Sequence, residues 1–220
     1  MFIIATKKPW HKSSFLKIQN KKFKLINNYK DLNINQLKKI KPKIIFFPHW
    51  SKKVSDKIIN NYTCICFHET DLPYGRGGSP IQNLIIRNKK KTMISALIMS
   101  NKIDAGNIIC KKPMRLNGSA KAIFENSSKI IFQMIKHISK MKKIKSVEQK
   151  GKITYFKRLK NNSKIINNYK NLNSLYNHIR MLDAPTYKKA YVQFKNVKVT
   201  LSNATKNNKS IKAQALIELK

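Results

Sequence analysis

The sequence predicts an α/β fold built on a mostly parallel β-sheet, followed by a small α+β extension at the C-terminus. Over residues 1–145, short apolar runs typical of buried strands alternate with helical patterns, which indicates parallel βαβ units. After residue 151 the pattern changes to one amphipathic helix followed by strands with alternating apolar residues. We therefore expect a catalytic domain at 1–145 and a small subdomain at 151–220.

The strands expected in the first domain are apolar runs at residues 2–5, 23–26, 43–47, 63–67, 92–99 and 108–110. Apolar residues at helical spacing predict helices at 11–18, 35–40, 54–59, from 80 onward, and from 119 to 141. Pro42 ends the second of these helices. Ser79 and Pro80 suit the cap and first turn of the fourth, and Ser119 can cap the longest.

The C-terminal subdomain is expected to begin with a short strand at 153–156 and to contain a helix in which Leu175, Ile179 and Leu182 share one face. Strands follow at 190–194 and 197–201, joined by a turn at 195–196. A last strand places Ile211, Ala213, Ala215 and Ile217 on one side. The Asn- and Lys-rich stretch at 160–170 reads as a solvated loop.

The net charge is +38, from 47 Lys and Arg against nine Asp and Glu, and only five of the basic residues are Arg. Arg, more than Lys, makes the bidentate contacts by which proteins hold phosphates and bases. The lysines are spread along the chain, which favours a generally Lys-rich surface over a dedicated nucleic-acid face. Such a surface would still attract anionic substrates.

Several classes of protein are not expected from this composition. No apolar run approaches the roughly 20 residues that span a membrane, and the N-terminus does not resemble a secretory signal. The three Cys form neither an even disulfide set nor a CxxC pair, which favours a cytoplasmic protein with reduced thiols. The His residues have no partners at metal-ligand spacing, so no metal site is expected.

Residues 64–106 form the candidate site. Four of the six Gly in the chain fall within this stretch, together with His68 and three of the nine acidic residues, among them Asp104. Gly at Gly75, Gly77 and Gly78 suits positive φ or close approach of a ligand. His49, Trp50 and His68 each follow a predicted strand, where ligands of parallel sheets bind.

These residues resemble a known family. His68, Leu72-Pro73, Arg76-Gly77, Pro80-Ile81 and Asp104-Ala105-Gly106 follow the order and spacing of motifs in the formyltransferase family, closely over residues 43–112. The resemblance implies a Rossmann-like sheet and an enzyme that uses 10-formyltetrahydrofolate as donor. The segments 70–85 and 175–185 resemble the small sugar N-formyltransferases, including the type proposed for pseudaminic acid synthesis. The expected acceptor is therefore the amine of a nucleotide-linked amino sugar.

By this resemblance His68 is the catalytic base and Asp104 orients it. An imidazole suits proton transfer at neutral pH, and a carboxylate stabilises the imidazolium that forms. The family has Asn two residues before the His, where this chain has Cys66, and a thiol is a weak donor. Gln82, a water or main-chain N–H groups would then stabilise the oxyanion. Cys66 itself is interpreted as a packed thiol rather than a nucleophile.

The resemblance also implies the residues around the donor and the acceptor. The expected donor-binding residues are Phe47, Pro48, His49, Trp50, Pro73, Arg76, Gly77, Gly78, Asp104 and Gly106. Trp50 could equally be a core aromatic. Lys7, Lys8 and Trp10, after the first strand, could contact the substrate phosphates or nucleotide, although simple surface placement is a close alternative.

Three alternatives stay open. The acceptor could be methionyl-tRNA, although we expect a larger C-terminal domain in that branch than the roughly 70 residues here, or it could be glycinamide ribonucleotide. The protein could instead be a basic RNA-binding protein on a degenerate formyltransferase scaffold. A nucleic-acid partner is not expected in the leading interpretation, and a homodimer is expected only by analogy.

Overall fold

The computed structural model describes residues 1–159, 163–165 and 169–219. The chain divides into two compact units, described separately below. The first unit comprises Met1–Gly77, Thr92–Met114 and Glu125–Tyr155, and the second comprises Gly78–Lys91, Arg115–Phe124 and Phe156–Lys220. The second unit thus contains two segments that the sequence analysis assigns to residues 1–145. Much of the stretch 160–170, expected as a loop, lies outside the described residues.

The first unit is built on a six-stranded sheet with the order β2-β1-β3-β4-β6-β7. Its strands are β1 (Phe2–Ala5), β2 (Phe23–Ile26), β3 (Ile44–Phe47), β4 (Cys64–His68), β6 (Lys91–Ile98) and β7 (Ile108–Arg115). The four strands β2, β1, β3 and β4 are parallel, and β6 runs antiparallel to β4. The mostly parallel α/β sheet is therefore confirmed, and β7 is longer than the run of 108–110 predicts.

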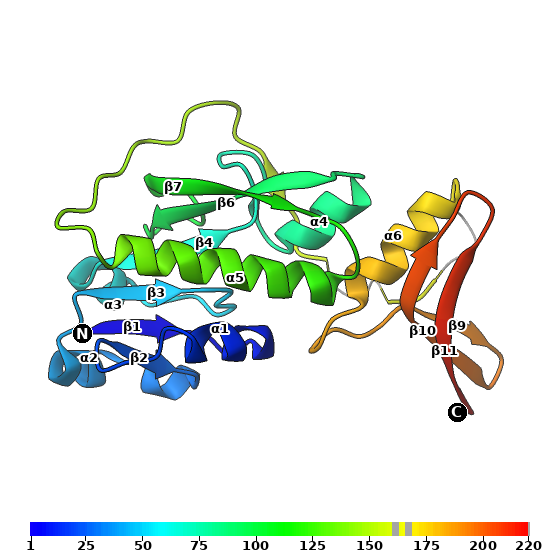
Figure 1. Cartoon of the computed structure of the whole chain (residues 1–220), viewed down its shortest axis with the longest axis horizontal. Helices are drawn as coiled ribbons and strands as arrows, with labels where there is room; N and C mark the ends of the chain where they lie inside the picture. The colour runs from blue at the N-terminus through cyan, green and yellow to red at the C-terminus, as the bar shows by residue number, and fades with distance from the viewer. Residues whose placement is uncertain (160–162, 166–168, 220) are drawn as a thin grey trace. The chain divides into compact units, whose positions relative to one another are not determined.

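Helices cover both faces of this sheet (Figure 1). They are η1 (Pro9–His11), α1 (Lys12–Leu16), η2 (Tyr29–Asp31), α2 (Ile34–Ile40), α3 (Asp56–Asn61) and α5 (Ala120–Ile138). On one face, Leu37 of α2 and Ile58 of α3 join the buried strand residues Ile3, Ile45 and Phe47 in one cluster. Residues 125–138 of α5 lie on the other face, where its side chains reach the segments that follow β1 and β4.

The order of the strands determines where a ligand can bind. The chain passes from β1 outward to β2 and then returns to β3 on the other side of β1. Ligands of open α/β sheets bind beyond the carboxyl ends of the strands at such a switch point. His11 and His49 lie in the segments that follow β1 and β3, and His68 is the last residue of β4, so these three histidines come to the same edge of the sheet.

The second unit contains α4 (Pro80–Ile86), α6 (Leu172–Leu182) and an antiparallel sheet of β9 (Tyr191–Phe194), β10 (Val197–Lys206) and β11 (Ile211–Leu219). Arg180 of α6 is 4% exposed, and its guanidinium donates to the carbonyls of Leu116 and Gly118 at 2.8 Å each. These bonds tie α6 to the chain before α5. Ile217 on β11 is 67% exposed, so the predicted alternation does not correspond to burial within this chain.

Ser79 precedes α4 as predicted, but its side chain does not cap the helix. Its φ is +51°, and its hydroxyl accepts a hydrogen bond from the backbone N–H of Leu159 instead. The left-handed backbone turns the side chain away from the first turn. Two short strands, β5 (Arg76–Gly77) and β8 (Tyr155–Phe156), form a separate pair. Within residues 1–159, 163–165 and 169–219, no helix has the length and apolar character to cross a membrane.

Candidate active site

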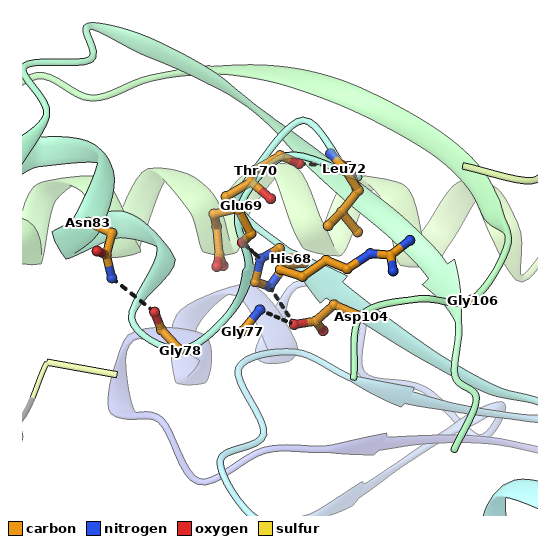
Figure 2. A network of polar contacts seen from close by, with 12 residues as sticks. His68, Glu69, Thr70, Leu72, Gly77, Gly78, Asn83, Asp104 and Gly106 are labelled. Carbon is orange, nitrogen blue, oxygen red and sulfur yellow. Dashed lines mark hydrogen bonds and ion pairs between the residues drawn. The ribbon is translucent and has the colours of Figure 1, made fainter. Parts of the chain in front are cut away.

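His68 and Asp104 face each other in the first unit. His68 is the last residue of β4 and is 6% exposed. Its Nδ1 lies 3.6 Å from Oδ2 of Asp104, and its Nε2 lies 2.7 Å from the carbonyl oxygen of Gly75. Figure 2 shows the Asp104 carboxylate directed toward the imidazole of His68. The structure thus brings together the two residues expected to be base and orienter.

Asp104 has a φ of +51°, a conformation that costs a non-Gly residue about 1–2 kcal/mol. Three hydrogen bonds hold it there. The Gly77 N–H donates to Oδ2 of Asp104 at 2.9 Å (Figure 2). The side-chain amide of Gln149 donates to the carbonyls of Asp104 and Gly106 at 2.8 Å each. Hydrogen bonds therefore hold both the side chain and the backbone of Asp104.

Gln149 also contacts the glycine loop. Its Oε1 accepts hydrogen bonds from Nε and Nη2 of Arg76, at 3.1 and 2.8 Å. One amide thus joins the loop of Arg76 and Gly77 to the loop of Asp104 and Gly106. The sequence analysis missed Gln149, because it lies in a polar segment with no regular pattern, 45 residues beyond Asp104.

Gly106 allows a close approach of two backbones rather than of a ligand. A Cβ atom at this position would lie 1.7 Å from the carbonyl oxygen of Ile98. The loop of Asp104 therefore packs directly on the end of β6, and only glycine fits. Pro73 is buried, and its carbonyl accepts from the Thr154 N–H at 3.3 Å.

Cys66 occupies β4 two residues before His68 and so points to the same face of the sheet. Burial, and next the carboxylate of Asp104, raise the pKa of its thiol well above the ordinary value. The thiol therefore stays protonated at neutral pH and is not a nucleophile. Burial likewise raises the pKa of Cys64 to about 12.

Two of the predicted site residues belong to the second unit. The amide of Gln82 donates to the Met181 carbonyl of α6 at 3.5 Å. The Gly78 N–H donates to the Phe156 carbonyl, and a Cβ at Gly78 would lie 2.6 Å from the Cβ of Arg158. In that unit, Gln82 and Gly78 both make packing contacts.

An aromatic cluster lies on the side of the sheet that carries α2 and α3. Trp50 packs edge-on against Phe47 and Tyr29, with ring centroids 5.9 and 4.7 Å apart. Cys66 and Met99 pack against the same cluster. The Trp50 Nε1–H is buried and has no hydrogen-bond partner among the residues that the structure describes. Aromatic and apolar side chains beside one orphaned donor suit a flat heteroaromatic ring that carries an acceptor, such as a pterin. Phe47, 2% exposed, and the buried Pro48 contribute to the core beneath it.

The side chains of His49 and Trp50 lie on opposite sides of the backbone that joins them. The φ of His49 is +50°, and its ring lies on the opposite side from Trp50, in contact with Trp10, His11 and Glu69. Trp10 is 8% exposed, and its indole N–H donates to His49. The sequence analysis placed His49 beside the donor and Trp10 beside the acceptor, whereas the structure places them together in a buried polar cluster.

A cavity of about 950 Å³ lies beside β1 and β2. Its lining contains no carboxylate, and its basic residues are Lys7, Lys8, Lys12, Lys21 and Lys24. Phe15, Phe23 and Leu25 contribute apolar surface. The arrangement suits an anionic ligand with an apolar part. Among the described residues, no group of three or more His, Cys, Asp or Glu could hold a metal ion.

Similarity to known proteins shows the family to which the chain belongs. Residues 160–218 match the family described as methionyl-tRNA formyltransferase, C-terminal domain. The methionyl-tRNA formyltransferase of Sulfurihydrogenibium sp. is 26% identical over 82% of this chain and 60% of its own length. The solved structure titled methionyl-tRNA formyltransferase from Clostridium thermocellum is 39% identical, with a TM-score of 0.93 over 100% of this chain and 99% of that one. The chain belongs to the formyltransferase family.

Formyltransferases are enzymes, and they use 10-formyltetrahydrofolate. The chain spans 48–64% of the length of five curated methionyl-tRNA formyltransferases that it matches. A 4-N formyltransferase from Francisella tularensis shares the fold, with a TM-score of 0.66 and 18% identity over 88% of this chain and 92% of that one. The Clostridium chain has nearly the same extent as this one, whereas the curated methionyl-tRNA formyltransferases are longer, as expected for that branch.

Proposed function

We propose that this formyltransferase transfers the formyl group of 10-formyltetrahydrofolate to a primary amine, and that the amine belongs to methionyl-tRNA. The observation that carries the chemistry is the His68–Asp104 pair, held by the Gly77 N–H and by Gln149. 10-Formyltetrahydrofolate supplies the formyl group as an activated amide. The residues that would hold it are those of the aromatic cluster around Trp50.

The geometry assigns the proton transfer to one nitrogen of His68. The Gly75 carbonyl can only accept, so the neutral imidazole carries its proton on Nε2. Nδ1 is then free to take a proton from the attacking amine. The positive charge forms 3.6 Å from the Asp104 carboxylate, which stabilises it.

Three observations support methionyl-tRNA as acceptor over the amino sugar expected from the sequence. The identity of 39% extends over the whole chain and over nearly all of a methionyl-tRNA formyltransferase. The sugar enzyme is similar only at the level of the fold. The charge of +38 and the carboxylate-free cavity suit a polyanion.

The test is a formyl-transfer assay with 10-formyltetrahydrofolate and three classes of acceptor. These are initiator methionyl-tRNA, UDP- and TDP-linked 4-amino sugars, and glycinamide ribonucleotide, with mass spectrometry of the product. We expect formyl-methionyl-tRNA and no formylated sugar. Formylation of a sugar alone would overturn the acceptor and keep the chemistry. Binding of generic RNA without folate binding would overturn both.

Gln149→Glu tests the support of Asp104. The substituted carboxylate can still accept from Arg76 but cannot donate to the two carbonyls and repels them. We expect kcat for formyl transfer to fall about 30-fold with a smaller change in the donor KM. The matched control is Glu148→Gln, the reverse change at the exposed neighbouring position. Equal kcat values for Gln149→Glu and wild type would contradict the role of Gln149.

Trp50→Phe tests the donor pocket. The substitution keeps an aromatic ring against Tyr29 and Phe47 but removes the orphaned N–H. We expect the Kd for tetrahydrofolate, measured by calorimetry, to rise about tenfold, since one hydrogen bond is lost. Trp10→Phe removes an indole from the other side of the sheet and should leave that Kd unchanged. An unchanged Kd in Trp50→Phe would show that Trp50 is a core aromatic.

A further inference from the structure

One face of the sheet in the second unit consists of apolar side chains. Residues that pair directly across antiparallel strands point to the same face, and every second residue along a strand shares it. Val199 of β10 pairs with Val192 of β9 and with Ile217 of β11. We refer to this row and its continuation as the apolar face, which comprises Val192, Phe194, Val197, Val199, Leu201, Ile211, Ala213, Ala215, Ile217 and Leu219.

The apolar face is not covered by the chain itself. None of its ten residues is buried. Phe194, Ile217 and Leu219 are 62%, 67% and 77% exposed. Single exposed apolar residues are common, but an apolar face that extends over three strands indicates contact with another molecule. Lys206, opposite Ile211 at the end of the sheet, is the only charged residue in this row, which disfavours a polyanion as the molecule that covers it.

Strand β11 also has a free edge. Within the described part of the chain, no strand lies beside β11 on the side away from β10. The Leu201 N–H donates to the Ala190 carbonyl at 2.8 Å, on the β9 side. Leu201 and Ala215 are therefore a pair without hydrogen bonds to each other, and the N–H and C=O of Ala215 point outward. The same holds for every second residue of β11, so its backbone can accept a further strand.

The composition of β11 does not protect this edge. Edge strands that remain unpaired usually carry proline or several charges, lysine above all. β11 has nine residues, no proline, and only Lys212 and Glu218 as charged side chains. Its net charge is zero in a chain whose net charge is +38. A second strand can therefore approach β11 with less electrostatic repulsion than the lysine-rich composition of the chain implies elsewhere.

The sequence of β11 is complementary to itself in an antiparallel pair. The register that overlaps all nine residues places Ala215 opposite Ala215 of a second copy. In that register, Lys212 of each copy lies opposite Glu218 of the other, and opposite charges directly across two strands stabilise the pair. Glu218, which also pairs with Lys198 of its own chain at 3.2 Å, then lies between two ammonium groups. The register with the greatest overlap is thus also the one that pairs the charges.

We propose that β11 pairs antiparallel with β11 of a second copy of this chain, so that the protein is a homodimer joined through its C-terminal sheets. The pairing unites the two three-stranded sheets into one and satisfies the outward N–H and C=O groups of β11. The exposed side chains of Ile217 and Leu219 gain cross-strand neighbours from the second copy. The proposal depends neither on the acceptor nor on the role of His68.

Sedimentation equilibrium of the full chain tests the proposal, with an expected mass of twice the 25.6 kDa of one chain. Ala215→Pro removes an N–H at the centre of the junction. It leaves the hydrogen bonds between β10 and β11 in place, because that N–H points outward and proline is tolerated at such a position of an edge strand. We expect the dimer Kd of Ala215→Pro to rise about 100-fold.

Charge exchange tests the register. Lys212→Glu and Glu218→Lys each place like charges opposite one another, and we expect each to raise the dimer Kd about tenfold. The double variant Lys212→Glu/Glu218→Lys restores opposite charges and should recover the dimer. Along one strand these two side chains are about 20 Å apart, so recovery can arise only between two copies. The matched control is Lys209→Glu, the same change at an exposed position before β11, which should leave the Kd unchanged.

Circular dichroism shows whether each variant is folded, and the charge variants decide alone if Ala215→Pro is not. A wild-type monomer at about 100 μM would overturn the proposal. So would a folded Ala215→Pro variant that dimerises like wild type, or a double variant that dissociates as readily as the single ones. A wild-type monomer that binds uncharged phosphatidylcholine vesicles would assign the apolar face to a lipid surface instead. None of these outcomes bears on formyl transfer, which the acceptor assay tests separately.

Discussion

Replacing His68 with Ala lowers kcat for formyl transfer by about 1,000-fold, the loss expected when a general base is removed. Nδ1 of this residue is the nitrogen that takes the proton from the amine, and Oδ2 of Asp104 lies 3.6 Å from the same nitrogen. Without the imidazole, the proton must pass to water, and the charge that Asp104 would stabilise does not form.

The rate is measured in single turnovers with saturating donor and acceptor, so that chemistry rather than product release is observed. His137→Ala is the matched control, because it makes the same change on an exposed position of α5. Retention of more than a tenth of the wild-type rate in His68→Ala, with an intact circular dichroism spectrum, would remove His68 from the mechanism.

Gly106→Ala produces the second large effect, on folding. The added Cβ would lie 1.7 Å from the carbonyl oxygen and 2.9 Å from the carbonyl carbon of Ile98. Both atoms belong to the backbone of β6, so no side-chain rotation can relieve the clash. The loop must move away, and Asp104 moves with it. We expect the free energy of unfolding of the first unit to fall by about 3 kcal/mol.

Urea unfolding followed by circular dichroism measures this loss. Gly118→Ala is the control, because its φ of +80° also disfavours a side chain, while the nearest atom to the added Cβ, the Cβ of Ala122, is 3.4 Å away. We expect a cost of about 1 kcal/mol there. Equal losses at the two positions would mean that the loop does not depend on its approach to β6.

The periodicity of apolar residues was sufficient to place most elements of the first unit. The runs at 2–5 and 23–26 coincide with β1 and β2. The run at 43–47 begins one residue before β3, and the run at 63–67 is shifted by one residue from β4. Such runs are informative because strands buried on both faces leave no room for polar residues. The helix expected at 11–18 is only five residues long, since Leu16 and Lys17 are exposed and give it no further face to bury.

The candidate site was predictable only where its residues follow one another in a motif. His68 and Asp104, which lie 3.6 Å apart, were expected in this way. Gln149 could not be, because its role depends on contacts with residues 45 and 73 positions earlier in the chain. His49 and Trp50 were expected in one pocket because they are adjacent. The φ of +50° at His49 sends them to opposite sides of the sheet, and a sequence does not display a backbone angle.

The bonds made by Gln149 also bear on the order in which the site is completed. His68, Arg76 and Asp104 all leave the ribosome before the segment that joins their loops. A nascent chain that ends at residue 140 contains the base and its carboxylate but lacks the amide that links the Arg76 and Asp104 loops. Contacts of such long sequence separation form late in folding. The site is therefore complete only at the end of folding, when the segment after α5 brings Gln149 to the Arg76 and Asp104 loops.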